Sequence, residues 1–356
     1  MRVICLNNYP LEKATRMADE GTYPRQHLWG TDALRDTGDD VVFTPFLEPT
    51  SHPTWTRIHE AARYGLGSFD QQAFALRHLT RGSVIYSADA RSATGLALAS
   101  RLWRRHPPVV CVVHHASPPR PLLSAASRSY AHLLCLTPHV ADDLVRVQGV
   151  TPDRVTVAAW GPDLTFPGYQ PPPPRPGLHL VCAGKSNRDL RTLVAGLSGS
   201  PADALVYDLD DQLGGSTVPP NVTVIGASAD DADPATRSTY HYEPVLSRFR
   251  QATAIAVPIR DVSLLTGLTE INDALALGLP FIVTSSDYLP FDPEAIGCGI
   301  VVEPGDVSGW RRALDRLSHD TERAAMGAAG RRFAEEHWNY HRFCDAVVAA
   351  IHGVRS

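Results

Sequence analysis

Short apolar runs rich in valine and isoleucine recur along the whole chain, and they constrain its fold more than any other feature. Runs that are apolar on both faces, with helical or loop segments between them, are typical of parallel strands covered by helices on both sides. The first half contains RVICLN, DVVFTPF, SVIYS, VVCVV, LLCLT and RVTVAAW, and the second contains LHLVCAG, ALVYDL, VTVIG, AIAVPI, PFIVTS and GIVVEP. The pattern therefore predicts that each half folds as an α/β, Rossmann-like domain with a doubly wound parallel sheet. We expect the two domains to face each other across a cleft.

A proline-dense stretch, FPGYQPPPPRPG at residues 166–177, separates the two sets of runs. Proline fixes its φ angle and lacks an N–H, so this stretch is excluded from helices and sheet interiors and predicts an extended spacer. A surface loop inserted within one domain is the alternative. We predict an N-terminal domain over residues 1–165, this linker, a C-terminal domain over residues 178–335 and a final helix over residues 336–356.

The totals limit the classes of protein to consider. At 356 residues and 44% hydrophobic content, the chain is long enough for two domains with separate cores. Its formal charge of -5 comes from acids and bases spread along the sequence, which argues against nucleic acid as a main partner. Arginine supplies nearly all positive charge, a pattern that indicates a GC-rich bacterial genome. No apolar run approaches the roughly 20 residues of a membrane helix, and no signal peptide is expected.

The cysteines are isolated from one another, with no C-x-x-C pair or Cys/His spacing of the kind that binds metals. We therefore expect buried, reduced thiols in a cytoplasmic protein. The cysteines are Cys5, Cys111, Cys135, Cys182, Cys298 and Cys344. Since Asp287 has no second carboxylate at metal-ligand spacing, we predict no metal site and no cofactor.

The stretch LTGLTEINDALALGLP, residues 265–280, predicts a turn followed by an apolar helix, and the buried strand FIVTSS follows it. Glu270 lies in the first helical turn and Asp273 one turn later, so both carboxylates share a face near the helix N-terminus. The free N–H groups of that end could bind a phosphate. Glu270 could equally be an ordinary N-terminal acid. The apolar neighbours of Asp273 imply burial, so its carboxylate needs a partner, for which a ligand hydroxyl is one candidate.

DALALGLPFIVT, with IVVEPGDVSGWRRAL downstream, resembles the nucleotide-sugar signature of the family 4 glycosyltransferases of GT-B fold. The resemblance implies that Asp273 binds the donor ribose, and that a second acid eight positions earlier contacts the sugar. That position is Leu265 here, so either Glu270 or a backbone group makes the contact, or the sugar is recognised differently. It further implies that the final helix returns to the first domain and that catalysis is independent of metal. We assign the backbone around Gly267, Leu268 and Thr269 to the donor diphosphate.

LHLVCAGKSNRDLRTLVAGL, residues 178–197, predicts a strand, a loop and an amphipathic helix. A lysine and an arginine beside a glycine and a helix N-terminus form an anion site through charge and free N–H groups together. The resemblance implies that such a basic pair grips the donor diphosphate, and Lys185 and Arg188 match it at a shorter spacing. Gly184 and Asn187 complete this predicted donor site. A solvated turn is the alternative, and Asn187 could instead cap the helix.

PPVVCVVHHASPP, residues 107–119, places two histidines at the carboxyl end of a buried strand. Two such side chains at a strand end favour a role in the cleft over a structural one. The resemblance implies that a histidine here contacts the transferred sugar; we assign His114 this role and keep His115 as the alternate. The strand-end loop Tyr86 to Asp89 remains open between a structural and a functional role.

The loop after the first strand contains only Gly21 where the family has a Gly-Gly turn. Arg25, Gln26 and His27 follow it, and we predict that they bind the acceptor; a plain N-terminal turn is the alternative. The segment RLWRRHPP, residues 101–108, is basic and carries a tryptophan, so it could contact an anionic membrane peripherally or form an ordinary solvated face.

These observations lead to a functional hypothesis. We predict a hexosyltransferase that moves a sugar from a nucleoside diphosphate, UDP first and GDP or dTDP next, to a hydroxyl on a small molecule or glycan. The resemblance implies that anomeric configuration is retained. Two alternatives stay open: a non-catalytic GT-B-like binding or partner-activating subunit, and a nucleotide-sugar epimerase. The sequence leaves the base, sugar and acceptor unspecified.

Overall fold

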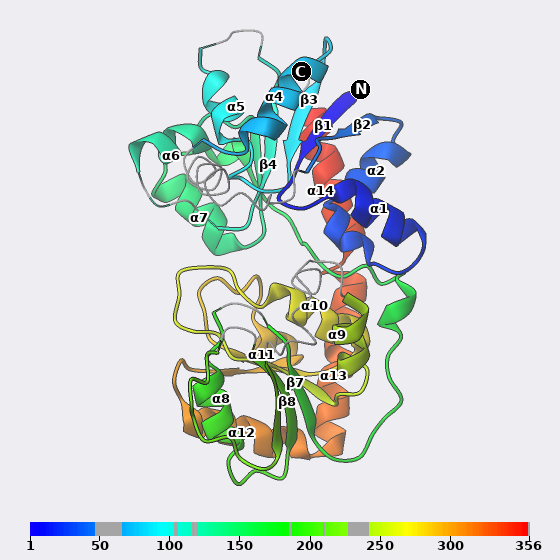
Figure 1. Cartoon of the computed structure of the whole chain (residues 1–356), viewed down its shortest axis with the longest axis vertical. Helices are drawn as coiled ribbons and strands as arrows, with labels where there is room; N and C mark the ends of the chain where they lie inside the picture. Colours follow the sequence, from blue (N-terminus) through cyan, green and yellow to red (C-terminus); the bar gives the residue numbers. More distant parts are fainter. Residues whose placement is uncertain are drawn as a thin grey trace. The chain divides into compact units, whose positions relative to one another are not determined.

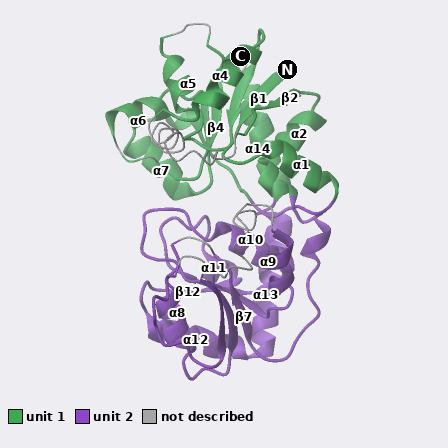
Figure 2. Ribbon diagram, viewed as in Figure 1, with its two compact units in different colours: residues 1–20, 25–160, 340–356 green, residues 21–24, 161–339 purple. Residues whose placement is uncertain are grey.

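A computed structural model describes residues 1–46, 66–102, 106–115, 118, 120–184, 187–208, 211–226 and 242–354. The chain forms two compact units (Figure 2). Unit 1 comprises Met1–Glu20, Arg25–Trp160 and Tyr340–Ser356, and unit 2 comprises Gly21–Pro24 and Gly161–Asn339. The division falls near the predicted boundaries, and the last helix is grouped with unit 1.

Unit 1 is built on one parallel sheet of six strands in the order β2-β1-β3-β4-β5-β6, of which β1 to β4 are labelled in Figure 1. Its strands are β1 (Arg2–Leu6), β2 (Asp40–Phe43), β3 (Val84–Ser87), β4 (Val109–Val113), β5 (His132–Cys135) and β6 (Val155–Val157). Its helices are α1 (Leu11–Asp19), η1 (Arg25–Leu28), α2 (Thr31–Asp36), α4 (Phe69–His78), α5 (Thr94–Ala99), α6 (Pro121–Ser127), α7 (Pro138–Arg146), η2 (Pro152–Arg154) and α14 (Tyr340–Gly353). Strand β4 is buried at every position, as its unbroken apolar run predicts.

Unit 2 contains a second parallel sheet of six strands, in the order β12-β11-β10-β7-β8-β9. Its strands are β7 (His179–Cys182), β8 (Asp203–Asp208), β9 (Val222–Gly226), β10 (Ala254–Val257), β11 (Phe281–Thr284) and β12 (Gly299–Val302). Its helices are η3 (Pro167–Tyr169), α8 (Leu190–Leu197), α9 (Tyr242–Phe249), α10 (Leu268–Leu277), α11 (Pro293–Ile296), α12 (Val307–Ser318) and α13 (Asp320–Glu336). All twelve apolar runs form strands, so the predicted doubly wound sheets are confirmed.

Close packing in unit 2 depends on a glycine between two helices. Trp310 of α12 is 1% exposed and belongs to the apolar core of this unit. A Cβ atom on Gly196 of α8 would lie 2.7 Å from the Cβ atom of Trp310, so a larger residue would force the two helices apart. The large indole therefore fills the core only because the facing residue has no side chain.

In unit 1, the final helix α14 is fixed to the region around α2. The N–H of Gly30 donates a hydrogen bond to the Tyr340 hydroxyl at 3.0 Å, and that hydroxyl donates to Asp32. A Cβ atom on Gly30 would lie 3.1 Å from the Cβ atom of Val347, so the glycine also permits a close approach. These contacts account for the grouping of residues 340–356 with the first sheet.

The proline-dense stretch at residues 166–177 differs from the extended spacer that the sequence predicted. Residues 166–177 belong to unit 2, and part of the stretch folds as η3. Phe166 and Tyr169 are 4% and 1% exposed, with their rings packed edge to face at a centroid distance of 5.3 Å. Proline content excluded regular structure, but the aromatic side chains between the prolines gain free energy by burial. The stretch is therefore anchored to the second unit.

Two further expectations concern thiols and membranes. All six cysteines are buried and free, as expected from their isolated positions. Within the described ranges, no helix has the length and apolar character needed to cross a membrane. In the basic segment at residues 101–108, Leu102 is 92% exposed, and residues 103–105, which include its tryptophan, lie outside the described residues.

Candidate functional site

The strand order of unit 2 points to one edge of its sheet. The chain order reverses between β7 and β10, and in doubly wound sheets ligands bind beyond the carboxyl ends of the strands at such a reversal. The loop after β7 is joined there to the loop after β10. Asp189 donates its N–H to the Pro258 carbonyl at 3.0 Å, and Arg260 donates its N–H to the Asn187 carbonyl at 3.0 Å. The described residues of the predicted anion loop, Gly184, Asn187 and Arg188, thus lie at the switch point.

Helix α10 begins at this edge, immediately after a glycine. Gly267 has a φ angle of 85°, in the left-handed region, and a Cβ atom there would lie 2.5 Å from Cγ1 of Val257 at the end of β10. Only glycine therefore lets the helix start so close to the strand. The helix has no side-chain cap at its N-terminus, and its first backbone N–H groups, including those of Leu268 and Thr269, lack intrahelical acceptors. The start of α10 can accept an anion.

Arg188 and Glu270 form a buried ion pair at the same edge. Their side chains are 3% and 11% exposed, and Nη2 of Arg188 donates to Oε1 of Glu270. A Cβ atom on Gly184 would lie 1.8 Å from Nε of Arg188, so the glycine leaves room for the guanidinium. The arrangement brings Gly184, Arg188 and Glu270 together with the start of α10, as a donor site requires.

Two other residues of the predicted anion loop are placed differently. Asn187 has a φ angle of 54°, and α8 is capped instead by Asp189, which accepts from the N–H of Thr192 at 3.2 Å. The idea that Asn187 caps this helix is therefore wrong, because the left-handed turn at Asn187 puts the next acid at the cap position. Lys185 lies outside the described residues, so its assignment stays a prediction.

Asp273 is buried, as predicted, but its carboxylate is bonded to protein side chains. The residue is 2% exposed, and its Oδ1 accepts hydrogen bonds from the hydroxyls of Tyr169, at 2.7 Å, and Tyr242. Burial raises the pKa of Asp273 to about 7, opposed by the two tyrosine hydrogen bonds and assisted by the charge of Glu270. The partner that a buried carboxylate needs is supplied by tyrosines of η3 and α9 rather than by a ligand hydroxyl, and ribose binding by Asp273 stays a prediction.

Helix α10 is also held by two residues of the α13 region. Nε1 of Trp338 donates to Oδ1 of Asn272 at 3.0 Å, and Arg331 donates to the carbonyl of Ala276. Sequence analysis missed these contacts and the two tyrosines, because residues far apart in the chain supply them. Together they fix the direction of α10, and hence the position of its N-terminus, relative to the sheet of unit 2.

In unit 1, the two predicted histidines follow β4 and are half-buried. Nε2 of His114 lies 2.9 Å from the Ala88 carbonyl, which can only accept, so this nitrogen carries the proton. Burial lowers the pKa of His114, and burial followed by the charge of His114 lowers the pKa of His115 to about 4. Both imidazoles are therefore neutral near pH 7 and can act as hydrogen-bonding groups rather than as cations.

Buried polar atoms without a protein partner gather around these histidines. Among the described residues, no hydrogen-bond partner is found for five of them: Nδ2 of Asn7, Nε1 of Trp29, Oδ2 of Asp89, Oγ of Ser92 and Nδ1 of His115. Asn7 follows β1, Asp89 follows β3 and His115 follows β4, which are neighbours in the sheet. A buried polar atom without a partner is costly, so several at one sheet edge indicate a place for a polar ligand.

Trp29 adds a strained backbone to this cluster. Its φ angle of 56° is unusual for a large side chain, and such strain concentrates at functional sites. The Tyr86 hydroxyl donates a hydrogen bond to the Trp29 carbonyl at 2.6 Å. The Trp29 ring lies 4.8 Å from the His114 ring, between centroids, and stacks on the Trp160 ring at 4.9 Å. The strained turn thus places the indole beside the histidine. Asp89 was a candidate from its strand-end position, whereas no sequence pattern singled out Trp29.

The predicted acceptor residues are not collected at this cluster. Gln26 and His27 are 0% and 8% exposed, and Trp160 donates its Nε1 proton to the Gln26 carbonyl at 2.8 Å. Burial lowers the pKa of His27 to about 4. Arg25 pairs with Asp19 at 2.8 Å and with Asp32 at 3.6 Å. The loop packs into unit 1 because Leu28 and Trp29, which follow the polar residues, are buried, and this favours the plain-turn alternative.

Comparison with solved structures defines the class of fold. Sucrose-phosphate synthase from Thermosynechococcus elongatus superposes with a TM-score of 0.69 at 15% identity, covering 99% of each chain. A trehalose-6-phosphate protein of E. coli bound with UDP-2-fluoro glucose gives 0.63 at 12% identity and 98% of each chain. Anabaena Alr3699/HepE in complex with UDP gives 0.61 at 11% identity, covering 99% of this chain and 100% of the other. The chain thus has the GT-B fold of two Rossmann-like domains.

A separate match concerns the first part of the chain. Residues 31–166 match the model of Glycosyltransferase Family 4. No curated protein matches the chain. The resemblance to family 4 glycosyltransferases of GT-B fold, predicted from the sequence, is confirmed, and the match and the fold together support glycosyltransferase function.

Proposed function

We propose that the protein transfers a sugar from a nucleoside diphosphate to a hydroxyl acceptor with retention of anomeric configuration, and that it acts in the cytoplasm. The observation that carries this proposal is the buried Arg188 beside the start of α10, at the switch point of the unit 2 sheet. UDP is the first candidate nucleotide, because the Anabaena protein is in complex with UDP and the E. coli protein carries UDP-2-fluoro glucose.

The diphosphate is bound, in this proposal, without a metal. The backbone N–H groups at the start of α10 and the guanidinium of Arg188 face the same anion and stabilise the charge that develops on it as the sugar leaves. Glu270 orients the guanidinium through the ion pair and thereby fixes the direction of its remaining donors. Gly184 leaves room for the guanidinium and Gly267 lets α10 start close to β10, and Lys185 supplies a second charge.

The transferred sugar and the acceptor hydroxyl are assigned to the cluster of buried polar atoms in unit 1. Asn7 and Trp29 provide N–H donors there, and Asp89 provides a carboxylate acceptor. His114 is neutral and donates to Ala88, so its Nδ1 can accept from a sugar hydroxyl. A ligand with many hydroxyl groups satisfies donors and acceptors at once, which neither a simple anion nor an apolar molecule does.

The reaction step balances without another reactant. The bond between the anomeric carbon and the diphosphate oxygen breaks, and the acceptor oxygen forms its new bond on the same face. The acceptor proton passes to the leaving phosphate. His114 and His115 position hydroxyls as neutral groups and carry no covalent role.

One observation favours a second candidate, a non-catalytic GT-B-like subunit that binds a partner. Asp273 is bonded to two tyrosines, Arg188 is paired with Glu270, and Leu265 stands where the family has an acid. In this reading the donor edge of unit 2 has become structural, because its charged groups are satisfied within the protein. The two candidates differ in whether unit 2 binds a nucleotide.

The experiment compares thermal unfolding with UDP, GDP, ADP and dTDP, because a ligand at about a hundred times its Kd adds roughly 2.7 kcal/mol to the folded state. Arg188→Ala should abolish the response to the nucleotide that stabilises the wild type. Arg316→Ala, which removes an exposed partner of Glu322, is the matched control and should respond normally. Stabilisation by no nucleotide would favour the non-catalytic subunit. For a nucleotide that does bind, NMR of the product made from its sugar reports the anomeric configuration.

A further inference from the structure

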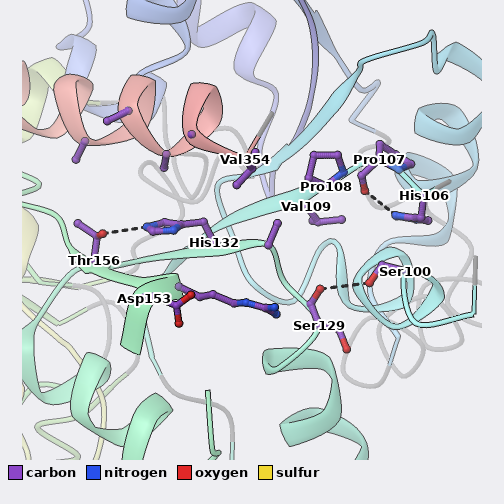
Figure 3. A pocket seen from close by; sticks show the side chains of 16 residues that line it. Ser100, His106, Pro107, Pro108, Val109, Ser129, His132, Asp153, Thr156 and Val354 are labelled. Atoms are coloured by element: carbon purple, nitrogen blue, oxygen red, sulfur yellow. Dashed lines mark hydrogen bonds between the residues drawn. The ribbon is translucent and has the colours of Figure 1, made fainter. Parts of the chain in front are cut away.

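A second candidate site lies at the opposite edge of the unit 1 sheet, where strands begin rather than end. A cavity of about 730 Å³ opens beside the first residues of β4 and β5 and beside β6, bounded by Val109, His132 and Thr156 (Figure 3). His114, in contrast, follows the carboxyl end of β4. The cavity is therefore separate from the cluster of buried polar atoms assigned to the acceptor.

The cavity exists because one face of α14 has almost no side chains. Ala346, Ala349, Ala350 and Gly353 all line it, at the spacing of a single helical face. A Cβ atom on Gly353 would have no other atom within 4 Å, so the space beside the helix end is open. Small residues thus keep the helix from filling the gap next to the strand ends.

The other walls carry hydrogen-bonding groups with little net charge. His132 is bonded through Nε2 to the Thr156 hydroxyl at 2.9 Å, and Nδ1 of His106 donates to the Pro107 carbonyl at 2.6 Å (Figure 3). Burial lowers the pKa of both imidazoles, so they are neutral near pH 7. Asp153 and its neighbour Arg154 contribute one negative and one positive charge to the lining.

This combination fits one class of ligand. The imidazoles, the carboxylate and the guanidinium offer both donors and acceptors, while two prolines and the alanine face offer apolar surface. A simple anion would gain no net attraction, because Asp153 and Arg154 contribute opposite charges to the lining. A metal ion is not indicated, since the described residues contain no cluster of three His, Cys, Asp or Glu side chains able to hold one. We propose that this cavity binds a neutral saccharide, through its hydroxyl groups on the polar walls and its C–H faces on the alanine and proline surface.

The proposal goes beyond sugar transfer, because it concerns glycan binding at a place remote from the reacting groups of unit 1. A saccharide bound here is an anchor: a part of a longer glycan that is recognised without being modified. The described residues that line the cavity all belong to unit 1, so the proposed binding does not depend on the donor edge of unit 2.

The test is an array of immobilised neutral and anionic oligosaccharides, probed with the full chain and two pairs of variants. Ala349→Leu projects a larger side chain into the cavity from an exposed helical position, and Ala325→Leu makes the same change on α13, away from it. Asp153→Asn removes the carboxylate of the lining, and Asp142→Asn makes the matched change on the exposed face of α7.

We expect the wild type to bind a subset of neutral oligosaccharides, with binding about tenfold weaker in Ala349→Leu and Asp153→Asn and unchanged in both controls. Retention of no neutral oligosaccharide, retention of anionic ones alone, or full binding by Ala349→Leu would overturn the proposal. The nucleotide response of Ala349→Leu should equal that of the wild type. Failure of glycan binding is thus distinguishable from failure of the donor site.

Discussion

The two units have the same kind of sheet, but the polar groups at the carboxyl ends of their strands differ in whether they have protein partners. At the carboxyl ends in unit 2, Arg188 pairs with Glu270, and Asp273 is bonded to two tyrosines. At the corresponding ends in unit 1, neutral histidines lie among buried polar atoms such as Oδ2 of Asp89, for which the described residues supply no partner. Unit 2 is thus largely satisfied before any ligand arrives, whereas unit 1 gains hydrogen bonds when one binds. The same type of domain thus carries two different arrangements of polar groups, because its loops rather than its sheets set the chemistry.

The largest effect should come from removing the cation of unit 2. Arg188→Ala leaves the buried Glu270 carboxylate without its partner, and we expect a loss of roughly 3–5 kcal/mol in the free energy of unfolding. Denaturant unfolding measures this loss. Replacing both residues, as Arg188→Met with Glu270→Leu, should restore most of the stability while nucleotide binding stays lost. If the double variant were as unstable as the single one, the loss of stability would not come from an unpaired Glu270 carboxylate.

In unit 1, Asp89→Asn should affect transfer far more than stability. The carboxylate oxygen without a protein partner costs free energy in the folded chain, so its neutralisation should leave the melting temperature unchanged or higher. A lost hydrogen bond between a carboxylate and an acceptor hydroxyl should lower kcat/KM by about 10 to 100-fold. Initial rates over a range of acceptor concentrations give this ratio, with Asp142→Asn as the exposed control. Normal transfer rates in Asp89→Asn would contradict the proposal that Asp89 binds the acceptor hydroxyl.

The raised pKa of Asp273 should be visible in the pH dependence of stability. Its folded pKa of about 7 lies above the ordinary value of 3.8, so the folded chain holds a proton that the unfolded chain releases. Its contribution to stability is therefore full below about pH 4 and is lost as the pH rises through 7. The melting temperature of Asp273→Asn relative to wild type should increase by a few degrees between pH 5 and pH 8. A constant difference across that range would contradict the raised pKa.

The smallest effect, of opposite sign, is expected for His115. Its pKa is lowered from 6.5 to about 4, so its contribution to stability is present above pH 6.5 and is lost as the pH falls toward 4. His115→Gln should reduce the acid-side loss of melting temperature by about one or two degrees, and it should leave the slope between pH 7 and 8 unchanged. If Asp273→Asn and His115→Gln changed the melting temperature over the same pH range, the expected difference between the two units would be contradicted.

Much of the fold could be read from local sequence, whereas less of the site could. The twelve apolar runs specify strands on their own, and Gly267 and Gly278 mark the ends of α10, because each signal depends on residues close together in the chain. Burial of Asp273 followed from its apolar neighbours. Its partners did not, because Tyr169 lies 104 residues away, in a stretch whose prolines indicated a spacer.

The sequence by itself determined the two parallel sheets, the residues at their strand ends and the family resemblance. Periodicity and composition are local properties, and the apolar runs carry them whatever their surroundings. Only the tertiary structure decided which partners the buried acids have: Glu270 pairs with Arg188, and Asp273 accepts hydrogen bonds from two tyrosines. It also decided that Gln26 and His27 are buried and that α14 leaves a cavity beside His132. The physical reason is that burial and pairing depend on distances between residues remote in sequence, which are fixed only when the elements pack.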